Sequence, residues 1–368
     1  MKMKTLFATS VSVAALLGTT VGTYAADLDA LYAAAKGEGQ LTVIALPHDW
    51  CGYGAVIDAF KKKYPGITVN ELNPDAGSGD EIQAIKANQG NTGPQAPDVI
   101  DVGLSFGPSS ITDKLIQPYK VSTWDSIPDS AKDKDGYWYG DYYGVLSFIV
   151  NDDLVKNAPK TWADLQKPEY ANQVALSGDP RVANQAIQSV YAAGLASGGT
   201  AGVDAGTKGL AFFAALNKAG NFVPVIGKAA PVAQGTTPIV ATWDYNALAW
   251  KDGFAGNPKA EVVVPSDGVV AGVYIQAISA YAPHLNAAKL WEEYLYSDEG
   301  QIGWLAGYCH PIRFNDLASK NAVPADLLAK LPDPALYAKA VFPTLDEQAA
   351  AKDAITKGWD STVGANVQ

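Results

Sequence analysis

The sequence predicts an α/β protein with two domains, and three observations support this prediction. Short apolar runs rich in β-branched residues alternate along the chain with stretches of helical spacing, which is typical of a mostly parallel sheet covered by helices on both faces. Apolar residues make up 48% of the 368 residues and charged residues 18%, a globular composition rather than a disordered one. This length exceeds what one hydrophobic core usually supports, so we expect two domains.

The N-terminus has the pattern of a secretory signal peptide. Lys2 and Lys4 precede an apolar stretch from Leu6 to Val21, and small residues stand at −3 and −1 of a cleavage site after Ala25. The alternative is a membrane anchor, but the stretch is short for a span and contains Ser, Thr and Gly. We therefore expect residues 1–25 to be removed and the mature protein to lie in the periplasm.

The chain is acidic and poor in arginine. It has 27 basic and 38 acidic side chains and a net charge of −11, which loss of the two leader lysines lowers to −13. Without a basic stripe to neutralise phosphates, we expect no nucleic-acid partner. All basic residues except Arg181 and Arg313 are lysines, so the placement of these two arginines is informative.

The first half of the chain alternates expected strands and helices. Pro65-Gly66 ends one helix, and Ser78 and Glu81 have the spacing of a capping box at the start of another. We expect strands over residues 41–46, 67–69 and 98–102, and helices over residues 55–64 and from Ser78 onward.

The second half continues the alternation. Residues 286–295 have the amphipathic spacing of a helix. Expected strands cover residues 144–150, 174–177, 237–242 and 262–264, and a further helix begins near Val182.

Several segments, taken in order, resemble those of a known family. They are residues 59–67, 97–101, 161–165, 168–170, 287–291 and 296–301. Their order and spacing resemble the type II periplasmic solute-binding proteins of ABC importers, in the branch that binds ferric ion, polyamines, aminophosphonates and related solutes. The resemblance covers essentially the whole mature chain.

The resemblance implies two Rossmann-like lobes joined by hinge strands, with a ligand cleft that closes around the solute. The first lobe would comprise residues 26–147 and 271–312, and the second lobe residues 148–270 and 313–368. It further implies a monomer without catalytic activity, cofactor or metal, which delivers a small solute to an ABC permease in the inner membrane.

Residues that follow the carboxyl ends of strands line the cleft in lobes of this kind. Applied to this chain, the rule selects seven ligand-binding candidates: Trp50, Ser78, Gly79, Ser105, Arg181, Trp243 and Asp244.

Two of these candidates suggest the chemistry of the solute. Arg181 can hold a carboxylate or phosphonate through two parallel hydrogen bonds, unless it forms a structural ion pair. Asp244, between Trp243 and Tyr245, suits an ammonium group, unless it caps the following helix. Together they predict a solute with an amino and an acidic group, such as γ-aminobutyrate or an aminophosphonate. A polyamine, thiamine or ferric ion is the alternative.

The other candidates carry weaker signals. Backbone N–H groups at Ser78 and Gly79 favour an anionic group, although Ser78 can equally be a helix cap. Trp50 is either an aromatic wall of the cleft or part of the core. The ferric-binding members of the family carry two adjacent tyrosines where this chain has residues 242–246 with a single Tyr, which counts against iron.

Cys51 and Cys309 are the two cysteines of the chain. In an oxidising compartment two cysteines most often pair, which predicts a disulfide. Two free thiols are one alternative. A zinc site with His48 and His310 is another, and it is disfavoured because the adjacent Cys309 and His310 cannot easily bind one tetrahedral ion.

One motif points to an enzyme instead. Residues 103–107 match the Gly-x-Ser-x-Gly nucleophile elbow after an expected strand, with His284 or His310 as a candidate base. Pro108 follows at once and no oxyanion-loop motif is present. A secreted serine hydrolase is therefore the lesser alternative, and Ser105 is better interpreted as a cleft hydroxyl.

Overall fold

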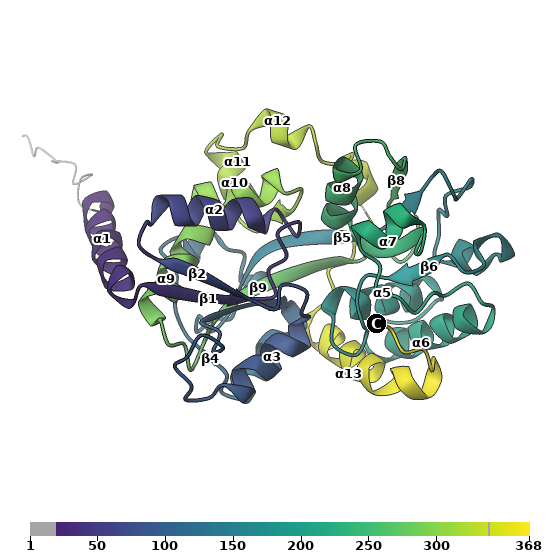
Figure 1. The fold of residues 1–368 in the computed structure, drawn as a ribbon, viewed down its shortest axis with the longest axis horizontal. Coiled ribbons are helices and arrows are strands. Elements are labelled where there is room, and N and C mark those ends of the chain that lie inside the picture. Colours follow the sequence, from purple (N-terminus) through teal and green to yellow (C-terminus); the bar gives the residue numbers. More distant parts are fainter. Residues whose placement is uncertain (1–19, 338) are drawn as a thin grey trace, which may run out of the picture.

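The structure is a computed structural model that describes residues 20–337 and 339–368 (Figure 1). Most of the expected leader, residues 1–25, lies outside the described residues, and helix α1 (Thr20–Glu38) begins before the expected cleavage point. Within the described part of the chain, every helix is too short or too polar to cross a membrane.

Two lobes lie side by side and are linked by the long strands β5 (Tyr139–Asn151) and β9 (Ala271–Ser279) (Figure 1). The first lobe contains β1 (Gln40–Ile44), α2 (Tyr53–Lys63), β2 (Thr68–Leu72), α3 (Ser78–Ala87), β3 (Val99–Gly103), α4 (Gly107–Thr112), β4 (Ile116–Gln117), α9 (Leu285–Leu295), α10 (Asp298–Ala306) and β10 (His310–Pro311). The second contains β6 (Val174–Leu176), α5 (Asn184–Ala196), α6 (Val203–Lys218), α7 (Ala229–Gln234), β7 (Ile239–Trp243), α8 (Asp244–Gly253) and β8 (Ala260–Val263).

The main sheet is largely antiparallel, so the expectation of a mostly parallel sheet is wrong. Its central order is β3-β9-β5-β7-β6, and only β6 and β7 run parallel within it. A second, two-stranded sheet pairs β1 with β2 in parallel. The reason is the pair of crossing strands: β5 leaves the first lobe and β9 returns to it, so the two run in opposite directions beside each other.

Strand β5 changes partners in the middle of its length. Residues up to Val145 pair with β9, and residues from Leu146 onward pair with β7. Directly before this point Gly144 lies opposite Gly272. A Cβ atom on Gly144 would lie 2.4 Å from the ring of Tyr245, and one on Gly272 2.2 Å from the ring of Trp243. The two glycines therefore let aromatic rings of the second lobe pack directly on the crossing strands.

The C-terminal segment packs on both lobes, which differs from the expectation that residues from 313 onward join the second lobe. The guanidinium of Arg313 is buried in the first lobe, where it donates to the carbonyl oxygen of Tyr296 and pairs with Asp298. Helices α11 (Phe314–Ser319) and α12 (Ala325–Leu328) lie beside α10 (Figure 1). The chain then pairs with the crossing strand at Val341, and α13 (Leu345–Thr362) packs on α5 and α6.

Candidate functional site

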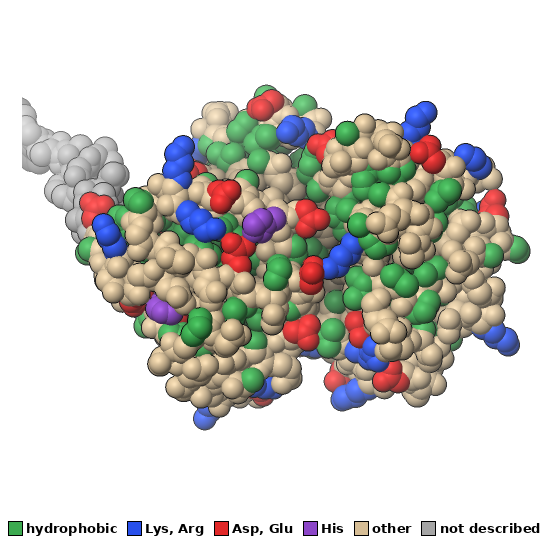
Figure 2. Space-filling model, viewed as in Figure 1, with side chains coloured by type: hydrophobic (Ala, Val, Ile, Leu, Met, Phe, Trp, Pro, Cys, Tyr) green, Lys and Arg blue, Asp and Glu red, His purple; other side chains and the backbone are tan. Residues whose placement is uncertain are grey.

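A cavity of about 190 Å³ lies between the two lobes. The first lobe lines it with the residues that follow β1, the N-terminus of α3 and Asp101 on β3. The second lobe contributes the residues between β6 and α5 together with side chains from α8. Acidic and basic side chains meet along the boundary between the lobes in Figure 2.

The cavity is lined by many carboxylates and few cations. Lys228 is the one basic side chain that lines it within the described residues, and it pairs across the lobes with Asp75. The acidic lining residues are Asp49, Asp75, Asp80, Glu81, Asp101 and Asp179. An excess of carboxylates around a cavity favours a cationic occupant.

Among these carboxylates, Asp101 is buried and also has one oxygen without a hydrogen-bond partner. Its Oδ2 accepts hydrogen bonds from the hydroxyl groups of Tyr53 (2.8 Å) and Tyr142 (2.5 Å). Its Oδ1 is buried and receives no donor. Burial raises the pKa of Asp101 to about 7, although the two tyrosine hydrogen bonds lower it. One oxygen of this buried carboxyl group, Oδ1, therefore lacks a hydrogen-bond donor.

Two amide groups of the second lobe share this feature. Asn184 and Asn246 line the cavity and are almost fully buried. The Oδ1 atoms of both receive no donor. The Asn184 side chain lies against Gly103 of the first lobe, where a Cβ atom would come within 2.1 Å of it. Three buried acceptors from both lobes thus lack donors, which a solute with N–H groups would supply.

Aromatic side chains form part of the wall. Trp50 and Tyr274 pack edge to face with ring centroids 5.2 Å apart. The Trp50 Nε1–H donates to the hydroxyl of Tyr142 (2.7 Å), which in turn donates to Asp101. Trp250 of the second lobe donates from Nε1 to Asp49 of the first (3.2 Å). Aromatic faces next to carboxylates suit a cationic nitrogen.

Trp50 and Ser78 are the two sequence-predicted candidates that line this cavity. Ser78 does not cap its helix as the capping-box pattern predicts, because its Oγ accepts the N–H of Gly103 (3.1 Å) at the end of β3. Glu81 likewise accepts the N–H of Asp101 (2.9 Å). The N-cap is Gly77, whose N–H donates to Asp80. Ser78 and Glu81, the residues of the expected capping box, therefore bind the backbone of β3 instead.

Gly79 and Ser105 lie outside the cavity lining. The Gly79 N–H donates to the carbonyl oxygen of Val182 (3.1 Å), a contact between the lobes. The Ser105 Oγ is buried without a partner, and the carbonyl oxygen of Ser105 accepts from Lys352. Of the candidate bases for a serine hydrolase, His284 pairs with Asp98 instead. His310 lies beside Asp244, so in the described part of the chain neither candidate histidine is hydrogen-bonded to Ser105.

Arg181 also lies outside the cavity lining, because other residues hold its guanidinium. It pairs with Asp179 (2.7 Å) and with Asp360 (3.2 Å) of α13, and it donates to the side chain of Asn366 (2.9 Å). The structural ion pair, which was the alternative to ligand binding, is what the structure contains.

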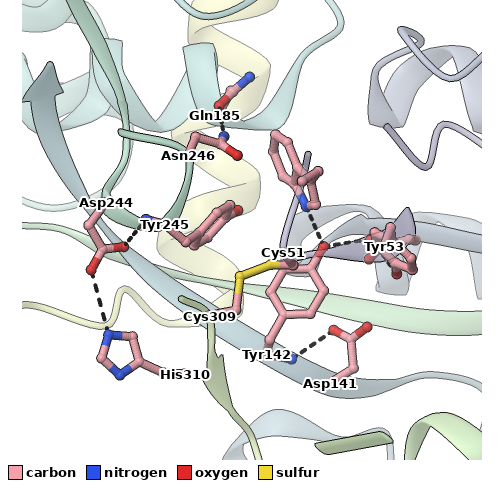
Figure 3. The surroundings of a disulfide bond; sticks show 12 residues. Cys51, Tyr53, Asp141, Tyr142, Gln185, Asp244, Tyr245, Asn246, Cys309 and His310 are labelled. Atoms are coloured by element: carbon pink, nitrogen blue, oxygen red, sulfur yellow. Dashed lines mark hydrogen bonds and ion pairs between the residues drawn. A yellow bond between two sulfur atoms is a disulfide. The ribbon is translucent and has the colours of Figure 1, made fainter. Parts of the chain in front are cut away.

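Trp243 and Asp244 are fully buried behind the cavity. The Asp244 carboxylate accepts the N–H groups of Val145 (2.9 Å) and Tyr245 (3.0 Å) and the hydroxyl of Tyr337 (2.8 Å). Figure 3 shows it directed toward His310, away from Asn246 and Gln185. Asp244 therefore fixes the crossing strand β5, and the cavity is lined by Asn246, two residues further along.

The expected disulfide joins Cys51 to Cys309, with Cα atoms 5.3 Å apart (Figure 3). It holds the loop that carries Trp50 against the end of α10. The zinc alternative is not supported, because His48 pairs with Glu71. In residues 20–337 and 339–368, no three His, Cys, Asp or Glu side chains are arranged to hold a metal ion.

Sequence reasoning missed Glu81, Asp101, Asn184, Asn246 and Lys228 as cavity residues. A signal for one of them was present: Asp101 stands inside the apolar run of β3, and a charged residue in a buried strand is rare unless it is paired or functional.

Comparison with known proteins places the chain in a family. A family model of bacterial extracellular solute-binding proteins matches residues 95–335, more than half of the chain. A candidate 2-aminoethylphosphonate-binding periplasmic protein of Salmonella typhimurium is 30% identical over 125 residues, 34% of each chain. The match thus spans about a third of the length of this curated relative.

Solved structures share the fold over nearly the whole chain. The periplasmic binding protein P5PA has a TM-score of 0.70 at 20% identity, covering 88% of this chain and 99% of that one. AfuA of Actinobacillus pleuropneumoniae, with exogenous fructose-6-phosphate bound, has a TM-score of 0.68 at 22% identity, covering 89% and 99%. Two lobes, crossing strands, a cavity between the lobes and the family match together lead to one conclusion: the chain belongs to the bacterial extracellular solute-binding proteins and has the type II periplasmic binding-protein fold.

Proposed function

We propose that the protein binds a small solute with a cationic amino group in the cavity between its lobes and delivers it to an ABC permease. The observation that carries this proposal is the set of buried acceptors without donors, Asp101 Oδ1, Asn184 Oδ1 and Asn246 Oδ1. An ammonium group has three donors and no acceptor. It complements such a set, whereas an anionic group would leave these acceptors unpaired and face the surrounding carboxylates.

The size of the cavity limits the solute. A protein cavity of about 150 Å³ holds one benzene molecule, and this cavity measures about 190 Å³. A solute of roughly six to eight non-hydrogen atoms fits this volume. Putrescine and γ-aminobutyrate are of this size, whereas thiamine is too large for a cavity of this volume.

A solute with both an amino and an acidic group is the second candidate. Similarity to the candidate 2-aminoethylphosphonate-binding protein of Salmonella favours it. Its acidic end would need a cation, and Lys228 lines the cavity. Lys228 is already paired with Asp75 of the opposite lobe, so an acidic group would replace Asp75 as its partner. Arg181, held by Asp179 and Asp360, is not available for this role.

The arrangement of the lobes supports a binding mechanism by closure. Contacts between the lobes include the ion pair of Asp75 with Lys228 and the hydrogen bond from Trp250 to Asp49. A solute that touches both lobes stabilises this closed arrangement over an open one. The closed protein is the form that the permease would distinguish from the empty protein.

A thermal-shift panel tests the proposal, because a bound solute raises the melting temperature by an amount that increases with its concentration over Kd. We expect shifts with putrescine, γ-aminobutyrate or 2-aminoethylphosphonate. Butyrate and ethylphosphonate, which lack the amino group, serve as matched controls and should give none. Shifts with these two anions but with none of the amines would contradict the proposal.

A further inference from the structure

We propose that binding of the solute's cationic nitrogen displaces a proton from Asp101, so that each solute bound near neutral pH is exchanged for a proton released to water. This inference rests on the proposed function and adds a pH dependence to the same site.

The Asp101 carboxyl is built to accept one further donor. Two tyrosine hydroxyls, from Tyr53 on α2 and Tyr142 on β5, donate to Oδ2, while Oδ1 has no donor. Gln276 of β9 donates to the Tyr53 oxygen and thereby orients that hydroxyl toward Asp101. The cavity borders this carboxyl. Asp101 is thus a cavity-lining carboxyl group with one buried oxygen that still lacks a donor.

No countercharge for Asp101 exists within the described residues. The titratable groups that interact with it are acids or phenols: Tyr53 on α2, Glu81 on α3, Asp141 and Tyr142 on β5, Tyr245 on α8, Tyr274 on β9, Glu292 on α9, and Tyr296 directly after α9. None of the ion pairs in the described part of the chain involves Asp101, Asp141, Glu81 or Glu292. Buried carboxylates without a countercharge take up protons instead.

Asp101 is the member of this group that titrates in the physiological range. Burial raises its pKa to about 7. Burial and neighbouring acids raise the pKa values of Glu81, Asp141 and Glu292 well above the usual range. The two tyrosine donors favour the ionised form of Asp101 and lower its pKa against the effect of burial.

The exchange conserves charge in the cavity. In the empty protein well below pH 7, the carboxyl group carries its proton. When an ammonium group enters, the O–H bond breaks, the proton passes to bulk water, and the carboxylate accepts an N–H of the ammonium group on Oδ1. The solute binds to the ionised form, so its affinity is constant well above pH 7 and falls as the pH drops below 7.

Titration calorimetry tests this exchange with putrescine and γ-aminobutyrate, whose charges do not change between pH 6 and pH 8. We expect Kd to rise about tenfold from pH 8 to pH 6. Measurements in two buffers of different ionisation enthalpy should show about 0.9 proton released at pH 6 and about 0.1 at pH 8.

Two variants separate the exchange from a loss of structure. Asp101→Asn should bind about tenfold or more weakly at pH 8, with no dependence of Kd on pH between 6 and 8. Tyr53→Phe removes one donor to Asp101 but keeps the ring, and Tyr53 does not line the cavity. It should move the pH at which affinity falls upward by about one unit. Asp58→Asn, on the exposed face of α2, is the control. It should change neither Kd nor the pH at which affinity falls.

The outcomes distinguish the two proposals. Amine binding with a Kd independent of pH and without proton release overturns the exchange but leaves the proposed function intact. A pH dependence that persists in Asp101→Asn overturns the assignment to Asp101. Failure of every amine to bind at any pH overturns the proposed function itself.

Discussion

The guanidinium groups of Arg181 and Arg313 are both fully engaged within the protein. Arg181 lies between Asp179 of its own loop and Asp360 of α13. Arg313 is 1% exposed and contacts Asp298 and Asp316. Both arginines hold the C-terminal segment, one against each lobe, which is a structural use of a residue that can contact several acceptors at once.

Replacement of Arg181 by Ala should leave solute affinity within twofold of the wild-type value. The reason is that Arg181 is outside the cavity lining, and its partly exposed ion pairs contribute about 1 kcal/mol or less to stability. Calorimetric Kd values for the tightest-binding amine of the panel provide the check. A loss of affinity of tenfold or more would restore Arg181 to the binding site.

The strand-end rule selected two residues that line the cavity, Trp50 and Ser78, and missed the buried Asp101. It selected Trp50 and Ser78 because each follows the carboxyl end of an expected strand in the first lobe. Asp101 lies within a strand rather than after it, and its partners Tyr53 and Tyr142 are distant in sequence. Such contacts between distant residues determine whether a buried side chain borders a cavity. Local sequence patterns do not encode these contacts.

At the scale of elements, local patterns predicted where strands lie in the sequence better than the direction in which they pair. The runs at residues 41–46 and 98–102 became β1 and β3 with small changes at their ends. The run at residues 144–150 became only the second half of β5, which starts at Tyr139. Its antiparallel pairing with β9 joins segments more than a hundred residues apart. Pairing over such a separation depends on the tertiary fold, so the alternation of elements could not reveal it.

The glycine pair on the crossing strands yields a test of packing. Gly272→Ala should destabilise the protein by about 1–3 kcal/mol, because the new Cβ would overlap the ring of Trp243. Urea unfolding measures the loss. Gly253→Ala, in α8 with open space around the added atom, is the matched control and should be neutral. Equal unfolding midpoints for Gly272→Ala and the control would show that the ring does not pack against the strand.

At the scale of the whole molecule, the disulfide closes a loop of 258 residues that contains the second-lobe elements from β6 to β8. The Cys51→Ser/Cys309→Ser variant should lose about 2–5 kcal/mol of unfolding free energy, because the cross-link restricts the unfolded chain. Denaturant unfolding under non-reducing conditions measures this loss. Reactive thiols in the unfolded, unreduced wild-type protein would contradict the disulfide itself.

The cavity lies between two lobes that are joined by the crossing strands and by direct contacts. Gly79 donates to Val182, Trp250 to Asp49, and Lys228 pairs with Asp75. Such contacts are individually weak. A solute in the cavity would add contacts with both lobes, and the acceptors that lack donors determine which solute can make them.

The central claim is that the cavity selects for a cationic nitrogen, and one comparison of Kd values tests it most directly. Titration calorimetry at pH 8 should give measurable binding of γ-aminobutyrate or 2-aminoethylphosphonate, and binding at least about a hundredfold weaker, or none, for butyrate and ethylphosphonate. Putrescine, which carries amino groups and no acid, should bind if the amino group alone suffices. Equal affinities for each amine and its matched anion would contradict the account.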